Sequence, residues 1–258
     1  MTPEQLALVA RLDGFVAQLQ QRLQAIFAEA TAGIDALMHQ RPGELVPIRN
    51  ALSGVEALAK QLTRTLQDTW DQRIEPMFRP HGERFLTAGE HRKEEARQDI
   101  EQAVTRFRLE QESRCLGAMY PAVQVAISQA RPCTNCGAPL RLAVPYEAES
   151  LSCSSCGVIN QLMPEALVRN YFLFGQEIFP AAAAHPVRVE IERAERLMDR
   201  ELRESGQKET LESRQQREAL ERKYWETYAA AKGSFLGRPP ETALIESRMA
   251  QFREGLRS

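Results

Sequence analysis

The sequence predicts a mainly α-helical protein with one small β module inserted into it. Segments near 3–38 and 48–74 repeat apolar residues with a helical period, and a more charged helical segment follows at 83–119. Residues 131–163 interrupt this pattern with four cysteines and short strand-like runs. We therefore expect three parts: a helical hairpin plus a third helix at 1–130, the small module at 131–163, and a helical region at 164–258.

The first predicted helix has a clear start and a regular apolar stripe. Thr2 is placed to act as the N-cap, with Pro3 at the first helical position and Gln5 completing a capping box. Apolar residues then recur at alternating spacings of three and four, which predicts a coiled-coil-like face. They are Val9, Leu12, Val16, Leu19, Leu23, Ile26 and Ala30.

A second stripe follows the turn predicted at Arg41–Pro42–Gly43. Its members are Ile48, Leu52, Val55, Ala59, Leu62, Leu66, Trp70 and Ile74. Two long helices with a short connection predict an antiparallel hairpin. The third helix, from Glu83 to Met119, carries a thinner stripe of Ala96, Ile100, Val104, Phe107 and Cys115, and we expect Pro121 to stop or kink it before a short apolar piece at 123–127.

The C-terminal region predicts further helices. One begins at Pro164–Glu165 and contains the aromatic stretch 171–174, which we expect to be core between the module and the helices, with an exposed docking patch as the alternative. We expect a joint at 181–186. Residues 187–232 are either one continuous helix or a helix interrupted at Ser205–Gly206.

Opposite charges in this region are spaced for ion pairs within a solvated helix. The expected pairs are Asp199–Arg203, Arg200–Glu204, Glu204–Lys208, Lys208–Glu212 and Arg214–Glu218. A final helix carries an apolar face that we expect to fold back against Leu220, Tyr224 and Tyr228. That face consists of Leu244, Ile245, Met249, Phe252 and Leu256.

Four of the five cysteines predict a metal site. Cys133, Cys136, Cys153 and Cys156 form the pattern C-x₂-C-x₁₆-C-x₂-C, with a glycine directly after each pair. Four thiolates give closed tetrahedral coordination, so we expect one structural Zn²⁺ and no open position for substrate. Iron with the same ligands and disulfides or a redox dithiol are the alternatives.

A module this small has too few apolar residues for a stable core, so a metal is expected to stabilise it. The runs Cys-Thr-Asn-Cys-Gly-Ala-Pro-Leu and Leu-Ser-Cys-Ser-Ser-Cys-Gly-Val-Ile-Asn resemble the zinc-ribbon family, in which two zinc knuckles lie on small β-hairpins. The resemblance covers about 131–162 and implies the four cysteine ligands. Members of that family bind nucleic acids, bind proteins or stabilise a fold, so the resemblance leaves the function open.

Other reactive residues carry weaker signals. Cys115 lies on an apolar stripe, which favours a buried core thiol over a reactive one. His81 and His91, near Glu83 and Glu94, could form a second metal site, but we expect them to be solvated because no Glu-x-x-His pair is present. Since no common catalytic motif occurs either, we expect a protein without enzymatic activity.

Charge and hydropathy narrow the function classes. The net charge is −2, and the balance also holds locally: residues 131–164 have two basic and two acidic residues, and residues 186–258 have 15 and 14. Nucleic-acid binding through the ribbon is therefore the second hypothesis, because phosphate binding requires basic surface. The first is a cytoplasmic scaffold or adaptor that binds a protein partner or itself through its helices. No apolar run is long enough to span a membrane, and no signal peptide is expected.

Overall fold

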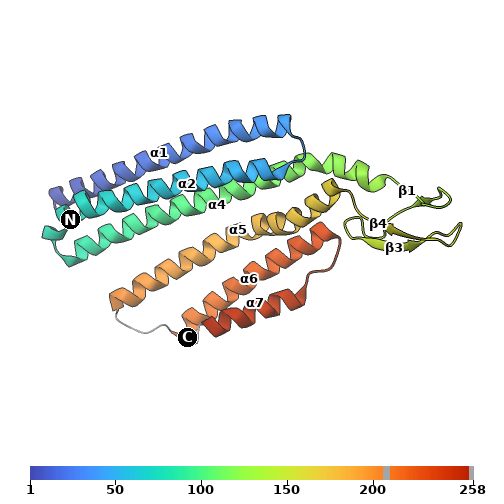
Figure 1. The fold of residues 1–258 in the computed structure, drawn as a ribbon. Coiled ribbons are helices and arrows are strands. Elements are labelled where there is room, and N and C mark those ends of the chain that lie inside the picture. Colours follow the sequence, from blue (N-terminus) through green and yellow to red (C-terminus); the bar gives the residue numbers. More distant parts are fainter. Residues whose placement is uncertain (206–209, 256–258) are drawn as a thin grey trace. The chain divides into compact units, whose positions relative to one another are not determined.

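The computed structural model describes the backbone of residues 1–205 and 210–255 and the side chains of residues 1–202 and 210–255. As predicted, the fold is mainly α-helical, with two small two-stranded sheets between helices α4 and α5 (Figure 1). The chain divides into two compact units, Met1–Glu112 and Ser113–Ser258.

In the first unit, α1 (Pro3–Gln40) and α2 (Leu45–Thr69) pack together as the predicted hairpin. The capping box is present: the Gln5 N–H donates to the Thr2 hydroxyl at 3.2 Å, and the Thr2 N–H donates to the Gln5 side chain at 2.9 Å. The stripe on α1 differs from the prediction in its second half, where Phe27 and Ile34 are buried and Ile26 is only half-buried. A straight helix drifts about 20° per heptad from a strict seven-residue repeat, so the buried face moves to neighbouring positions.

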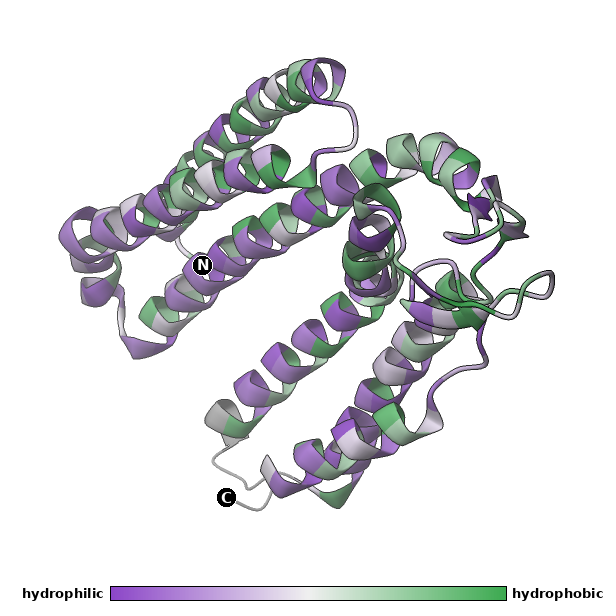
Figure 2. Cartoon of the chain, turned by 45° about the vertical axis from the view of Figure 1, so that its right-hand side comes forward, coloured by the Kyte–Doolittle hydropathy of each residue, from purple (hydrophilic) through white to green (hydrophobic). Residues whose placement is uncertain are grey.

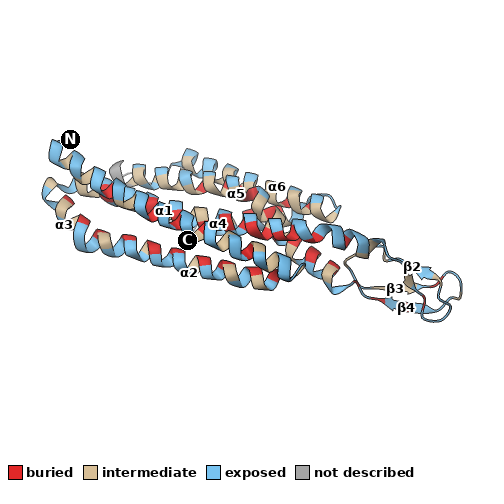
Figure 3. Ribbon diagram, turned by 90° about the horizontal axis from the view of Figure 1, so that it is seen from above, coloured by how far each residue is buried: buried red, intermediate tan, exposed pale blue. Residues whose placement is uncertain are grey.

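The predicted stripe of the second segment is confirmed at all eight positions, and Figure 3 shows buried residues recurring along α1 and α2. Beyond α2 the chain continues through a π-helical turn, η1 (Trp70–Ile74), a short helix, α3 (Glu75–Phe78), and a 3₁₀ turn, η2 (Arg79–His81). Trp70, Ile74 and Phe78 form a hydrophobic core with Leu12 of α1. This core closes one end of the first unit.

Helix α4 (Glu83–Ser128) contains the predicted third helix but does not end at Pro121. The expected stripe is buried, including Cys115 at 2% exposure. The expectation that Pro121 stops the helix is wrong, and residues 123–127 belong to α4. Proline removes a single backbone hydrogen bond, and the burial of Met119 and Val123 on either side of it, at 3% and 0%, favours the continued helix.

Helix α5 (Ala166–Ser205) likewise runs through Pro180 and Pro186, so the joint predicted at 181–186 is wrong. Apolar residues with helical spacing continue across both prolines and are buried, namely Ile178, Ala184, Val187 and Ile191. The alternative of one continuous helix over 187–232 is also wrong, because α5 ends at Ser205 and α6 (Leu211–Leu236) packs against it as a second helix.

Three ion pairs join α5 and α6: Arg188 with Glu221, Glu190 with Lys223, and Glu195 with Arg217. Of the expected pairs within one helix, those that involve Arg203, Glu204 or Lys208 fall on side chains outside the described residues. Glu218, expected to pair with Arg214, pairs with Arg253 of the last helix at 2.6 Å. The charge pattern therefore also supports pairing between helices.

Helix α7 (Thr242–Gly255) folds back on α6 as predicted. Ile245 and Met249 pack with Ala229 and Trp225, while Leu256 lies outside the described residues. Hydrophilic and hydrophobic positions alternate along the helices in Figure 2. Among the described residues, no helix is both long and apolar enough to cross a membrane.

Candidate metal centre

The cysteine module consists of two β-hairpins in the second unit. Strands β1 (Arg131–Pro132) and β2 (Pro139–Leu140) pair antiparallel, as do β3 (Glu149–Ser152) and β4 (Ile159–Leu162). One Cys-x-x-Cys pair occupies the turn of each hairpin. Each turn therefore carries two sulfurs at its tip.

The two turns share one backbone geometry. The N–H of Cys133 donates to the Ala138 carbonyl at 2.8 Å, and that of Cys153 donates to the Val158 carbonyl at 2.9 Å. Gly137 and Gly157 follow with φ of 74° and 75°, a left-handed conformation that glycine adopts without strain. This repeat explains why a glycine stands directly after each cysteine pair.

The four sulfurs come together as the spacing predicts. All lie within 4.8 Å of one another, with Cys133 Sγ 3.7 Å from Cys156 Sγ and Cys136 Sγ 3.6 Å from Cys153 Sγ. A tetrahedral zinc site with Zn–S bonds of about 2.3 Å has S···S edges of about 3.8 Å, whereas a disulfide would need about 2.05 Å. The four cysteines are therefore positioned to bind one metal ion, and none of them forms a disulfide.

Hydrogen bonds shift the pKa values of the cysteine thiols in different directions. The backbone N–H groups of Cys136 and Asn135 lower the pKa of the Cys133 thiol to about 6. At Cys136 the N–H of Ala138 lowers the pKa, but hydrogen bonds with the sulfurs of Cys156 and Cys153 outweigh it and raise the pKa to about 12. The Asn135 side chain and the Val158 N–H lower the pKa of Cys156. The neighbouring sulfurs therefore oppose deprotonation at Cys136, where a bound cation would favour it.

Asn160 is a supporting residue that the sequence reasoning missed. Its side chain is 2% exposed and lies beside the sulfurs. Nδ2 donates to Cys133 Sγ at 3.4 Å and to the Val158 carbonyl at 3.0 Å, while Oδ1 accepts from the Thr134 N–H at 2.8 Å and its hydroxyl at 2.9 Å. Asn160 thus connects the two Cys-x-x-Cys turns. Strand alternation could have identified Asn160 from the sequence, because it places this amide on the same face of the strand as the apolar Leu162.

The module also contacts the helices of its own unit through aromatic side chains. Tyr146 stacks on Phe172 of α5 with ring centroids 4.3 Å apart. Tyr171, 6% exposed, contacts Phe172, Tyr120 of α4 and Phe235 of α6. The stretch 171–174 is therefore core at Tyr171, as expected, while Leu173 remains 54% exposed.

The other candidate ligands do not assemble. Among the described residues, the four-cysteine cluster is the only group of three or more His, Cys, Asp or Glu side chains close enough to hold a metal. His81 instead makes an edge contact with the Phe85 ring at 5.5 Å, and Glu94 pairs with Arg97.

The fold and the site together define a mainly α-helical protein with a small β module whose four cysteines are positioned to bind a metal ion. No protein-family model, curated protein or solved structure matches the chain. The function must therefore be argued from the site itself.

Proposed function

We propose that the four cysteines bind one structural Zn²⁺. The observation that carries this proposal is the sulfur cluster, whose shortest separations of 3.6 and 3.7 Å match the edges of a zinc–thiolate tetrahedron. All four coordination positions are then filled by the protein, which leaves none for water or substrate. A reducing compartment keeps such thiols available for metal, so we also propose a cytoplasmic location.

Native mass spectrometry of protein purified without added metal tests the zinc proposal. We expect one zinc per chain, lost in Cys133→Ser and in Cys153→Ser together with the NMR signals of the ribbon. Cys115→Ala is the matched control, because Cys115 lies outside the cluster, and it should keep its zinc. A folded ribbon without metal would contradict the proposal. One iron per chain in place of zinc would show that iron is the metal that the four cysteines bind.

We further propose that the protein is a non-enzymatic scaffold or adaptor that binds a protein partner or a second copy through its helices. A closed metal site supplies no catalytic position, which favours a structural role. Large apolar side chains also remain exposed on the helices, at 44% to 72%, and such positions suit protein contacts. They are Leu6, Val46, Leu58, Leu173, Leu197 and Leu211.

Two measurements test the scaffold proposal. Light scattering after size-exclusion chromatography over a hundredfold concentration range should reveal a concentration-dependent oligomer if the chain binds itself. If the chain instead binds a different protein, crosslinking in the native host followed by affinity purification should recover that partner. A strictly monomeric protein that crosslinks to nothing would contradict the proposal.

Nucleic-acid binding through the ribbon is the alternative, and the charges do not favour it. Arg131 pairs with Glu165 at 3.8 Å, and Glu147 of the ribbon pairs with Arg238 at 2.6 Å. Binding of DNA or RNA that weakens steeply with added salt would establish this alternative. Fluorescence anisotropy at low salt measures it, and we expect no binding.

A further inference from the structure

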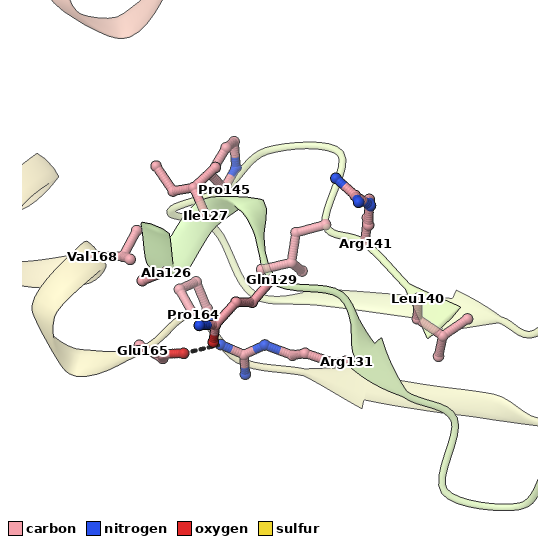
Figure 4. Close-up of a pocket in the computed structure, with 11 residues that line it drawn as sticks. Ala126, Ile127, Gln129, Arg131, Leu140, Arg141, Pro145, Pro164, Glu165 and Val168 are labelled. Atoms are coloured by element: carbon pink, nitrogen blue, oxygen red, sulfur yellow. Dashed lines mark ion pairs between the residues drawn. The ribbon is translucent and has the colours of Figure 1, made fainter. Parts of the chain in front are cut away.

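A small cavity lies where the ribbon meets the helices of the second unit. It has a volume of about 180 Å³ and is formed by the end of α4, the ribbon and the start of α5 (Figure 4). Its apolar walls include Ile127 and Val168 from the helices and Leu140, Leu142 and Pro145 from the ribbon. The cavity is thus lined by aliphatic side chains together with a similar area of polar atoms.

The size of the cavity limits what it can hold. Sites for cofactors and drug-sized ligands typically measure about 300–1,000 Å³. A cavity of about 180 Å³ lies below that range and is on the scale of one branched aliphatic side chain. A side chain from another polypeptide fits this space, and a nucleotide does not.

Charge around the cavity favours an acidic neighbour. Its charged lining residues are Arg131, Arg141 and Glu165, which leaves an excess of one positive charge. Arg131 pairs with Glu165 and donates to the Met163 carbonyl. Arg141 has no ion pair or hydrogen bond from its side chain within the described part of the chain, and Figure 4 shows it on the opposite side of the cavity from Val168.

We propose that this cavity binds a peptide segment of a partner protein that presents a branched aliphatic residue beside a carboxylate. The aliphatic side chain fills the cavity, and the carboxylate pairs with Arg141. This inference rests on the proposed protein-binding function and names the chemistry of the partner. It adds a docking site at the ribbon junction to the exposed helix positions.

The same site should depend on the metal. Leu140, Arg141 and Leu142 follow directly from the first knuckle, where β2 pairs with β1. When the metal is removed, this hairpin loses its main constraint and the ribbon wall of the cavity is lost. Binding at the cavity is therefore expected only in the zinc-loaded protein.

NMR titration of the ¹⁵N-labelled, zinc-loaded full chain with the peptide acetyl-Glu-Leu-Glu-amide tests the proposal. We expect millimolar binding with shifts confined to amides around 140–142 and 165–168. Acetyl-Gln-Leu-Gln-amide has the same shape without charge, and acetyl-Glu-Ala-Glu-amide cannot fill the cavity. Each should bind at least fivefold more weakly.

Two variants and one control complete the test. Arg141→Gln should weaken binding about fivefold and abolish the preference for the charged peptide. Ala126→Leu, which fills the cavity from α4, should abolish binding, and Arg169→Gln, which removes an exposed arginine of α5 outside the cavity, should change nothing. Equal affinities for the three peptides, or unchanged binding by Arg141→Gln, would overturn the inference. Either result would leave the scaffold proposal standing, because that proposal is tested separately by crosslinking of a partner to the helices.

Discussion

Replacing Asn160 with alanine should weaken metal binding although Asn160 is not a ligand. The substitution removes the hydrogen bond to Cys133 Sγ and the acceptor that Oδ1 offers to Thr134. Residues that orient metal ligands typically change affinity about 10- to 100-fold when mutated. We expect a loss in that range for zinc, which corresponds to about 1.4–2.7 kcal/mol.

The hydrogen bonds themselves give a similar magnitude. A bond to a charged group contributes about 1.5–3 kcal/mol, and a neutral one contributes about 0.5–1.5 kcal/mol. Thr134 is exposed, so water can replace part of the hydrogen bonding that it loses in Asn160→Ala. The lower half of the summed hydrogen-bond contributions therefore applies. For one bond to a charged sulfur and two neutral bonds, this range begins at about 2.5 kcal/mol, which lies inside the about 1.4–2.7 kcal/mol of the first route.

Competition with a chelator of known zinc affinity, at fixed pH, measures the effect. Asn160→Asp separates the two roles of the side chain, because aspartate still accepts from Thr134 but cannot donate to Cys133 Sγ and adds negative charge beside the thiolates. It should bind zinc no better than Asn160→Ala. Gln161→Ala, at the exposed neighbouring position of β4, is the control. A zinc Kd for Asn160→Ala within twofold of the unchanged protein would refute the reasoning.

Three further predictions concern packing, the metal and pH. Gly89→Ala should lower the free energy of unfolding, measured in urea, by about 1–3 kcal/mol, because the new Cβ would lie 2.6 Å from the Trp70 ring. The control is Gly33→Ala, whose Cβ would meet nothing within 4 Å and which should be neutral or stabilising. Chelation of zinc should erase the NMR signals of the ribbon while most helical circular dichroism is retained, and loss of both together would contradict a local role for the metal. A hydrogen bond from the Arg97 side chain lowers the pKa of Glu94 below its ordinary value of 4.5. The pair therefore stabilises the fold fully above pH 4.5, and this contribution is lost as the pH falls through the lowered pKa. Glu94→Gln should therefore flatten the dependence of stability on pH below about 5, and an unchanged slope would contradict the assignment.

The sequence was most informative where one residue type meets one strong physical requirement. Thiolates at the spacing of Cys133, Cys136, Cys153 and Cys156 suit one tetrahedral cation, and the structure brings their sulfurs together. The eight apolar positions of the second segment share one helical face, so their burial followed from the period alone. Both signals are local, since each depends on the order of nearby residues.

Helix ends were less predictable because they depend on what packs around them. Pro121, Pro180 and Pro186 are strong local breakers, yet each lies inside a helix. Each costs one backbone hydrogen bond, and the burial of neighbouring side chains such as Val123 and Val187 decides against a break. The end of α5 at Ser205 and the return of α6 follow from packing between two charged helices, which the sequence left as one of two alternatives.

By itself, the sequence determined a mainly helical chain and four clustered cysteines, because periodicity and ligand spacing are properties of neighbouring residues. Only the tertiary structure decided which polar side chain supports the sulfurs and where the cysteine module meets the helices. Asn160 acts across the two Cys-x-x-Cys turns, and the cavity beside Arg141 is formed by three separate segments of the chain. Contacts between residues far apart in sequence depend on the balance of packing over the whole unit, and no local pattern encodes that balance.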